Sequence, residues 1–202
     1  MKGLVMSFEE RIENLLQDKM TDEGFRFWKA LYEKIPPIWN RLSSSSKRYH
    51  NDENGRVKTI GEHTFEMLNA CAKTLRMFRI NNKCKEGDLL LLSIFLHDAF
   101  KYGINDPLNT KHTTSKHDNI VGNSIFAGKN KFLKLFDDKQ VALMEHITRY
   151  HSGIWSTDVN ESFSLRSLDP MALFVHILDM LSANNCLKIP KEIEEIKDDK
   201  TE

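Results

Sequence analysis

Residues 87–100 read GDLLLLSIFLHDAF, and this stretch decides the fold. Apolar side chains would cover nearly every face of a helix here, which is typical of a helix enclosed in a protein core. A strand is disfavoured, because the run is long and leucine dominates it. The stretch therefore predicts a buried helix that ends at the polar pair His97-Asp98.

Helical patterns flank this stretch on both sides. Ser7 and Glu10 have the spacing of a capping box, and another helix starts near Thr21. Further helices are predicted over residues 59–80, 119–128, 138–150 and 170–187. Strand-like alternation and internal repeats are both lacking in the sequence. The chain is therefore predicted to be an all-α, single-domain helical bundle.

Three parts are expected within that bundle. Residues 1–48 form an N-terminal helical extension that packs on the core, residues 49–189 form the main domain, and residues 190–202 form a charged C-terminal tail. The pattern leaves the oligomeric state open.

Composition limits the classes of partner. The chain has 202 residues, and its 29 Lys and Arg balance 29 Asp and Glu, so the formal net charge is zero. A neutral chain has no overall attraction for nucleic acid or for an anionic membrane, and neither is expected as a partner. The three cysteines form no CxxC pair, and the N-terminus has no apolar run of signal-peptide length. We expect a soluble, cytoplasmic protein.

Two acidic residues lie in strongly apolar surroundings. Asp98 ends the leucine-rich helix, and Asp179 lies within MALFVHILDMLSA at residues 171–183. A buried carboxylate is costly unless it is paired, and metal coordination offsets that cost. His63 and His97 add two imidazoles, although each residue alone has an ordinary structural explanation. Together they form a nitrogen–oxygen donor set suited to a divalent ion such as Mn, Fe, Co, Ni, Zn or Mg.

The order His63, His97-Asp98, Asp179 resembles the HD phosphohydrolase superfamily. The local sequences agree: GEHT at residues 61–64, LHDAFK at residues 96–101 and ILDMLSA at residues 177–183. The resemblance runs from about residue 49 to residue 187. It implies a helical bundle of HD-domain type, a metal centre with these four residues as ligands, and hydrolysis of a phosphoester or phosphoanhydride bond.

His117 and His151 resemble the additional histidines with which some HD subfamilies hold a second metal. Many dinuclear members carry two adjacent histidines at the second position, whereas this chain has His151-Ser152. The resemblance implies one or two divalent ions per chain and favours two. Asp98 would then bridge the ions.

The remaining histidines are less specific. His146 either contacts substrate or merely packs, and a role near the site is favoured. His176, three residues before Asp179, is interpreted as a core or supporting residue rather than a ligand. His50 and His112 are predicted to lie exposed in loops.

The mechanism implied by the resemblance uses water activated by the metal, whose pKa would fall from about 15.7 to about 7. Lys101 is the first candidate for a phosphate contact, and with Asp98 it forms the predicted catalytic pair. Trp155 either stacks on a base or closes the core. The predicted substrate-binding residues are Lys101, Lys116, His146, Arg149 and Trp155.

The leading functional hypothesis is an enzyme that hydrolyses a nucleotide or another small phosphorylated molecule. A GYP-type extension does not follow His151, which disfavours a cyclic-dinucleotide phosphodiesterase of that type. Two alternatives stay open: a regulatory HD module that binds metal or nucleotide without turnover, and an RNA or cyclic-nucleotide phosphodiesterase. A plain helical bundle with coincidental spacing of these residues is a further possibility.

Overall fold

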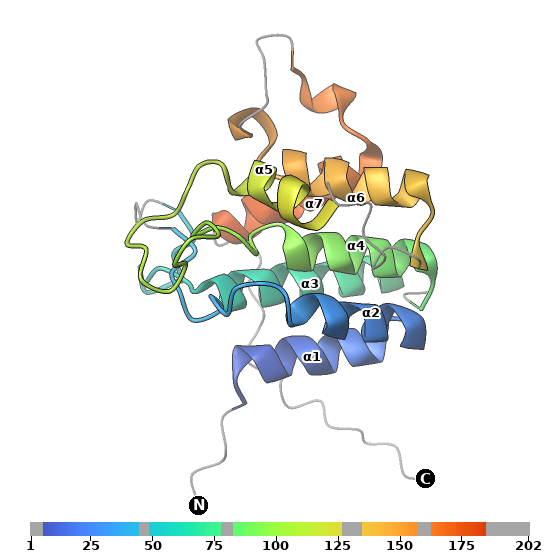
Figure 1. Cartoon of the computed structure of the whole chain (residues 1–202), viewed down its shortest axis with the longest axis horizontal. Coiled ribbons are helices and arrows are strands. Elements are labelled where there is room, and N and C mark those ends of the chain that lie inside the picture. Colours follow the sequence, from blue (N-terminus) through green and yellow to red (C-terminus); the bar gives the residue numbers. More distant parts are fainter. Residues whose placement is uncertain (1–5, 45–48, 78–82, 127–134, 157–162, 185–202) are drawn as a thin grey trace, which may run out of the picture.

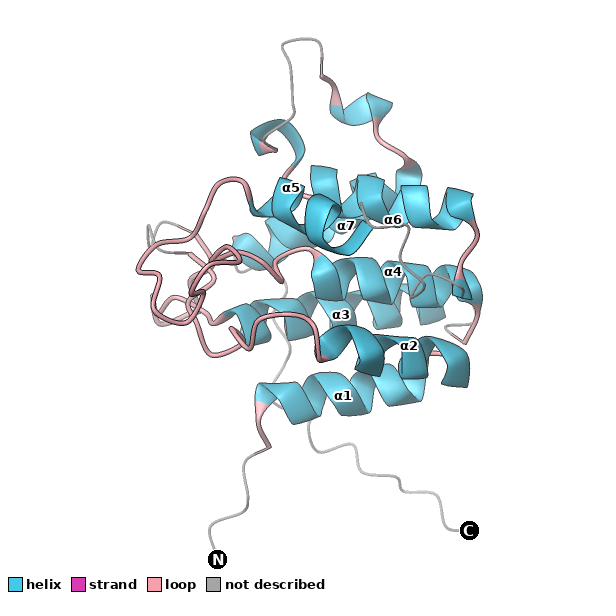
Figure 2. Ribbon diagram, in the orientation of Figure 1, coloured by secondary structure: helices cyan, strands magenta, loops and turns pink. Residues whose placement is uncertain are grey.

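The computed structural model describes residues 6–44, 49–77, 83–126, 135–156 and 163–184, and every regular element within them is helical (Figure 2). The first half contains α1 (Phe8–Lys19), α2 (Asp22–Tyr32), α3 (Ile60–Met77) and α4 (Lys85–Leu96). The second half contains α5 (His117–Val121), η1 (Gly122–Phe126), α6 (Asp138–Tyr150), η3 (Gly153–Trp155), η4 (Leu165–Ser167) and α7 (Pro170–Ala183). The prediction of an all-α bundle is confirmed.

Helix α4 occupies the middle of the bundle. It contacts α3 and α6 most extensively, and also α2 and α7. Figure 1 shows α4 between α1, α2 and α3 on one side and α5 and α6 on the other. Every residue of α4 from Gly87 to Leu96 is buried. This central position explains why the segment is apolar on all faces.

The N-terminal helices share the core of the rest of the chain. Trp28 and Trp39 pack on Phe95 of α4, with ring centroids 5.6 and 5.0 Å apart. A single hydrophobic cluster runs from Ile12 in α1 to Leu178 in α7. The described part of the expected N-terminal extension is therefore integral to the bundle. The expected tail at residues 190–202 lies outside the described residues.

Several helix boundaries follow the sequence signals. The capping box is present at α1: the backbone N–H of Ser7 donates to Glu10 Oε2, and the backbone N–H of Glu10 donates to Ser7 Oγ. Helix α6 covers residues 138–150, as predicted. The predicted ends of the long helix, at residues 78–80, and of the last helix, at residues 185–187, lie outside the described residues.

The segment predicted as a helix over residues 119–128 differs from expectation. Helix α5 begins earlier, at His117, and from Gly122 the chain continues as a π-helical turn. A Cβ atom at Gly122 would lie 2.6 Å from Arg149 Nη2, so glycine leaves room for this guanidinium beside the turn.

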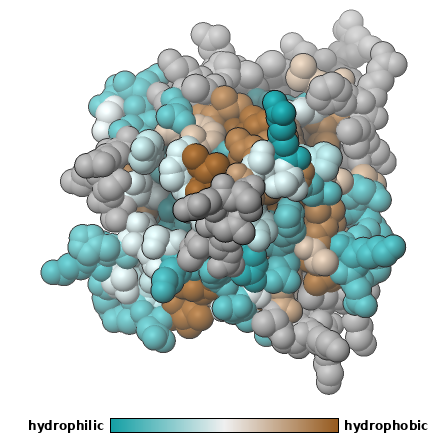
Figure 3. Space-filling model, turned by 90° about the horizontal axis from the view of Figure 1, so that it is seen from above, coloured by the Kyte–Doolittle hydropathy of each residue, from teal (hydrophilic) through white to brown (hydrophobic). Residues whose placement is uncertain are grey.

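The surface is mixed in character. Figure 3 shows apolar atoms near the middle of the face seen from above, bordered by hydrophilic groups. Within the described residues, no helix is both long and apolar enough to cross a membrane.

Candidate metal centre

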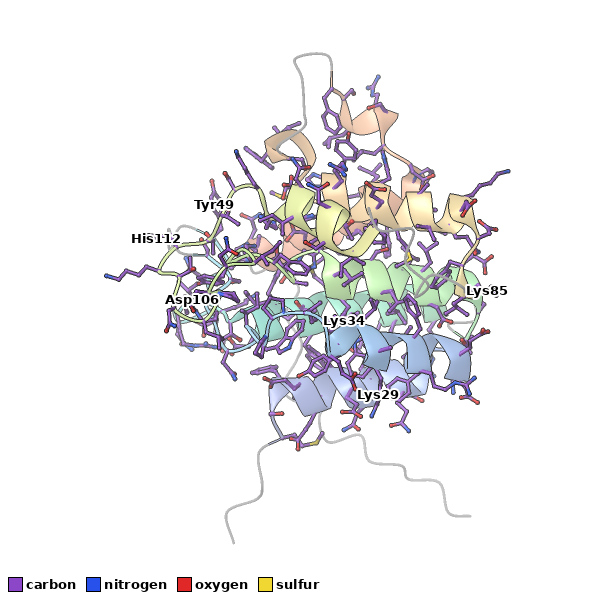
Figure 4. The ribbon with its side chains drawn as sticks, in the orientation of Figure 1. Lys29, Lys34, Tyr49, Lys85, Asp106 and His112 are labelled. Atoms are coloured by element: carbon purple, nitrogen blue, oxygen red, sulfur yellow. The ribbon has the colours of Figure 1, made fainter. Side chains whose placement is uncertain are left out.

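The pair His97-Asp98 lies directly after the last residue of α4, at the loop end of the bundle. Figure 4 places Tyr49, Asp106 and His112 in the loops at this end, whereas Lys85 marks the opposite end of α4. Because helices α3 and α7 also pack on α4, the polar residues of three helices meet here under cover of the loops.

The first group of donor atoms surrounds His63 of α3. Its Nε2 lies 3.2 Å from His97 Nε2, 3.1 Å from Asp179 Oδ1 and 3.9 Å from Asp98 Oδ2. The side chains of His63, His97 and Asp98 are at most 1 % exposed, and that of Asp179 is 13 % exposed. The structure therefore brings together the four residues that the sequence order singled out.

A second group shares Asp98 with the first. Asp98 Oδ1 lies 3.2 Å from His117 Nε2 and 3.7 Å from His151 Nε2, and these two nitrogens are 3.1 Å apart. His117 begins α5 and His151 follows the last residue of α6. Asp98 thus faces one group with Oδ2 and the other with Oδ1.

Backbone carbonyls fix the protonation of three of these imidazoles. Each Nδ1 lies within hydrogen-bond distance of the carbonyl oxygen three residues earlier, and a carbonyl can only accept, so Nδ1 carries the proton. The pairs are His97 with Ile94 (2.5 Å), His117 with Thr114 (2.9 Å) and His151 with Thr148 (2.7 Å). In a neutral ring, Nε2 then presents its lone pair to the site.

His63 is oriented by side chains instead. Its Nδ1 lies 2.8 Å from Ser182 Oγ, and that hydroxyl donates to Glu66 Oε2 over 2.7 Å. The Ser182 proton is therefore engaged with Glu66, so Ser182 accepts from His63 Nδ1. The buried ammonium of Lys58 holds Glu66 in place, with Nζ 2.6 Å from Oε2. His63 Nε2 also presents a lone pair to the site.

The four Nε2 lone pairs face one another and the two carboxylates. Burial lowers the pKa of His97 to about 3 and also lowers the pKa of His151, which keeps both rings neutral. Nε2 of His97 faces Nε2 of His63 at 3.2 Å, and Nε2 of His151 faces Nε2 of His117 at 3.1 Å. Two such lone pairs repel each other when both rings of a pair are neutral. Asp98 Oδ1 is buried and has no hydrogen-bond partner. A cation between these atoms would satisfy all of them, so the residues fit a metal ion.

Both carboxylates are ionised. Burial raises the pKa of Asp98, but the Lys101 ammonium, with Nζ 2.5 Å from Oδ2, and the nearby histidines hold it well below its ordinary value. Burial likewise acts against ionisation of Asp179, and the adjacent ring of His63 outweighs it, so this pKa is lowered as well. The two carboxylates and the Lys101 ammonium together carry one net negative charge.

A cleft of about 300 Å³ opens beside the first donor group. Lys101 lines it, as does Trp155, whose exposed fraction of 65 % excludes the expectation that it closes the core. The lining residues are Ser43, Ser44, Tyr49, His50, Lys101, Thr113, Ser152, Trp155, Asp179, Met180 and Ala183.

Three residues proposed as substrate contacts lie away from this cleft. Lys116 is exposed just before α5. The guanidinium of Arg149 is engaged by Glu145 and by Asn119, each at 2.7 Å.

His146 is the third of these residues, and its ring packs on Tyr150 with centroids 4.8 Å apart. His176, interpreted as a supporting residue, lies with Nδ1 2.7 Å from the backbone oxygen of His151. His112 is exposed, as predicted.

The prediction that His50 lies exposed in a loop was wrong. His50 is only 8 % exposed, and its ring lies nearly perpendicular to that of His63, with centroids 4.4 Å apart. Local sequence carries no signal for this position, because the loop is polar and its burial depends on contacts with residues distant in sequence. Among the described residues, His50 belongs to a group that could hold a metal ion and was not expected there from the sequence.

No family model, no curated protein and no solved structure matches this chain. The donor groups and the cleft are the observations from which we argue its function.

Proposed function

We propose that this protein is a metal-dependent phosphohydrolase of the HD type. It cleaves a phosphoester or phosphoanhydride bond of a nucleotide or a related small phosphorylated molecule. The observation that carries the proposal is the position of Asp98 between two groups of buried histidines, with one carboxylate oxygen toward each. That position suits a carboxylate shared by two metal ions.

The donor set assigns residues to each ion. His63, His97, Asp98 and Asp179 would hold one divalent ion, and Asp98, His117 and His151 would hold the other. Imidazole and carboxylate donors suit Mn, Fe, Co, Ni, Zn or Mg. When bound, such ions supply a nucleophilic water at neutral pH and polarise the phosphoryl oxygens.

Lys101 has two roles in this proposal. It offsets the charge of Asp98 through their 2.5 Å contact, and its position on the cleft wall suits an ammonium that binds a phosphoryl oxygen. Two divalent ions would convert the single net negative charge of the site into three positive charges. A site of that charge attracts phosphorylated ligands.

The cleft favours a small substrate with an aromatic group. Tyr49 and Trp155 are 56 and 65 % exposed and both line the cleft, so each offers an aromatic face to a base. A cavity of about 300 Å³ suits a mononucleotide or part of a dinucleotide rather than a long polymer.

The direct test is turnover of bis-p-nitrophenyl phosphate by the protein loaded with Mn²⁺. We expect metal-dependent hydrolysis that is lost in the His97→Ala/Asp98→Ala variant and retained in His112→Ala, which changes an exposed histidine. The same variants are then assayed against nucleotides, dinucleoside polyphosphates, cyclic nucleotides and short single-stranded RNA with several divalent ions. This second assay separates a nucleotide hydrolase from a phosphodiesterase.

A regulatory module would give a different result. It would bind Mn²⁺ and a nucleotide, and none of these compounds would be turned over with any of the ions. That outcome would overturn the enzymatic proposal while leaving the metal centre in place.

A further inference from the structure

His50 is held in an unusual backbone conformation. Its φ is +61°, a left-handed value that a residue with a Cβ atom adopts infrequently. Two long-range hydrogen bonds maintain it: the His50 N–H donates to Ala183 O over 2.8 Å, and the Lys58 N–H donates to His50 O over 2.7 Å. The fold thus fixes the direction of this side chain from both ends, at a cost in backbone strain.

The imidazole of His50 packs edge-on against His63, and that contact leaves one ring nitrogen without a partner. Its Nδ1 is buried and makes no hydrogen bond. Buried nitrogen atoms are nearly always paired, and an exception at a strained position indicates a function or a missing ligand.

One partner available to His50 is the ion expected at the first donor group. One ligand atom of each of His50, His63 and Asp179 lies within 4.8 Å of the others, a spacing at which they could hold a metal ion. His63 and Asp179 are already assigned to that ion, so His50 lies within reach of two of its ligands.

A separate third ion at this position is excluded by His63. Nδ1 of His63 donates to Ser182, so the ring has a single lone pair, at Nε2. That lone pair faces His97 and Asp179 and can bind only one ion. Any ion that His50 and His63 share is therefore the ion of the first donor group.

We propose that His50 is a further ligand of the metal ion held by His63 and Asp179. The proposal rests on the metal centre of the proposed function and adds one residue to it. It also gives a role to the strained loop. The backbone hydrogen bonds with Lys58 and Ala183 would hold the His50 imidazole, which belongs to no helix, at the position of a ligand.

The test compares binding of Mn²⁺ to the wild-type protein, His50→Gly, His50→Asn and His112→Asn. Glycine and asparagine both tolerate a positive φ, so neither variant forces the loop to rearrange. We expect both His50 variants to bind one of the ions at least about tenfold more weakly, the loss typical even for residues that only support a ligand. His112→Asn should bind as the wild type does.

A spectrum separates direct ligation from a structural role. The visible absorption of the Co²⁺-loaded protein should change in both His50 variants and stay unchanged in His112→Asn. Unchanged Mn²⁺ affinity and an unchanged Co²⁺ spectrum in the His50 variants would overturn the inference alone. The inference would also be overturned if the His50 variants bind metal normally but lose affinity for inorganic phosphate. His50 would then contact a ligand in the cleft instead of the ion. If the wild-type protein binds no Mn²⁺, both this inference and the proposed function fail.

Discussion

The Nε2 atoms of His117 and His151 lie 3.1 Å apart, while Nδ1 of each ring is bound to a backbone carbonyl oxygen. A second pair, His63 and His97, has the same relationship at 3.2 Å. Lone pairs converge in both pairs, and Asp98 lies between the pairs. Facing lone pairs destabilise the metal-free fold, but they orient the donor atoms before an ion binds. Such orientation is expected of a metal centre.

Removing one histidine of the second group should remove one ion. In His151→Ala, the second donor group loses a ligand while His63, His97 and Asp179 are untouched. We expect wild-type protein reconstituted with Mn²⁺ to hold two ions per chain and the variant to hold one, measured by elemental analysis after gel filtration. His112→Ala serves as the matched control and should hold two. Equal metal content in His151→Ala and wild type would contradict the dinuclear arrangement.

Ser182 should tune the affinity of the first ion without being a ligand. Ser182→Ala removes the group that accepts from His63 Nδ1 and frees the ring to rotate or to change tautomer. We expect Mn²⁺ affinity to fall by about 10–100-fold. Ser93→Ala is a suitable control, because Ser93 is also buried but donates to Leu89 O within α4. A loss of affinity that is equal in both variants would point to general destabilisation instead.

The metal-free protein should lose stability as the pH falls below 6.5. Burial lowers the folded-state pKa of His97 to about 3 and that of His50 to about 2, against an ordinary value of 6.5. Between these values the unfolded chain binds more protons than the folded chain, so the free energy of unfolding decreases with decreasing pH. Each such histidine should lower it by about 1 kcal/mol between pH 7.5 and pH 5.5.

Urea unfolding in the presence of EDTA at these two pH values measures the effect. His97→Gln should show a smaller difference between the two pH values than wild type, and His112→Gln the same difference. A free energy of unfolding that does not change between pH 7.5 and pH 5.5 would show that the histidines are not buried as neutral groups.

The contact between α2 and α4 should be sensitive to side-chain size. A Cβ atom at Gly24 would lie 2.3 Å from Asp88 Oδ2, and that buried carboxylate already accepts from Thr21 N and Thr21 Oγ1. Gly24→Ala should reduce the free energy of unfolding by about 1–3 kcal/mol, because Asp88 or the helix must shift. Glu23→Ala, an exposed change in the same turn, should cost less than about 1 kcal/mol. Equal stability of both variants in urea would show that the α2–α4 contact is loose.

The fold was largely predictable because its signals are local. The capping box of Ser7 and Glu10 and the apolar period of residues 138–150 each define a helix without reference to the rest of the chain. The all-round apolar character of residues 87–100 predicted the burial of α4 in the same way. The π-helical turn at Gly122 has no local sequence signal, and the Arg149 side chain from another helix lies against its first residue.

The cluster was predictable only in part. His63, His97, Asp98 and Asp179 stand out because polar residues in apolar helices are unusual. His50 gives no such signal, because hydrogen bonds to Lys58 and Ala183 decide its position. Arg149 stays a predicted substrate contact, although its i−4 neighbour Glu145 forms an ion pair with it.

Anomalous diffraction from crystals of the Mn²⁺-loaded protein tests the shared position of Asp98 most directly. We predict two anomalous peaks, one among His63, His97 and Asp98 and the other among Asp98, His117 and His151. No peak beside Asp98, or a single peak bound by residues outside both groups, would contradict the proposal that this carboxylate joins two metal ions.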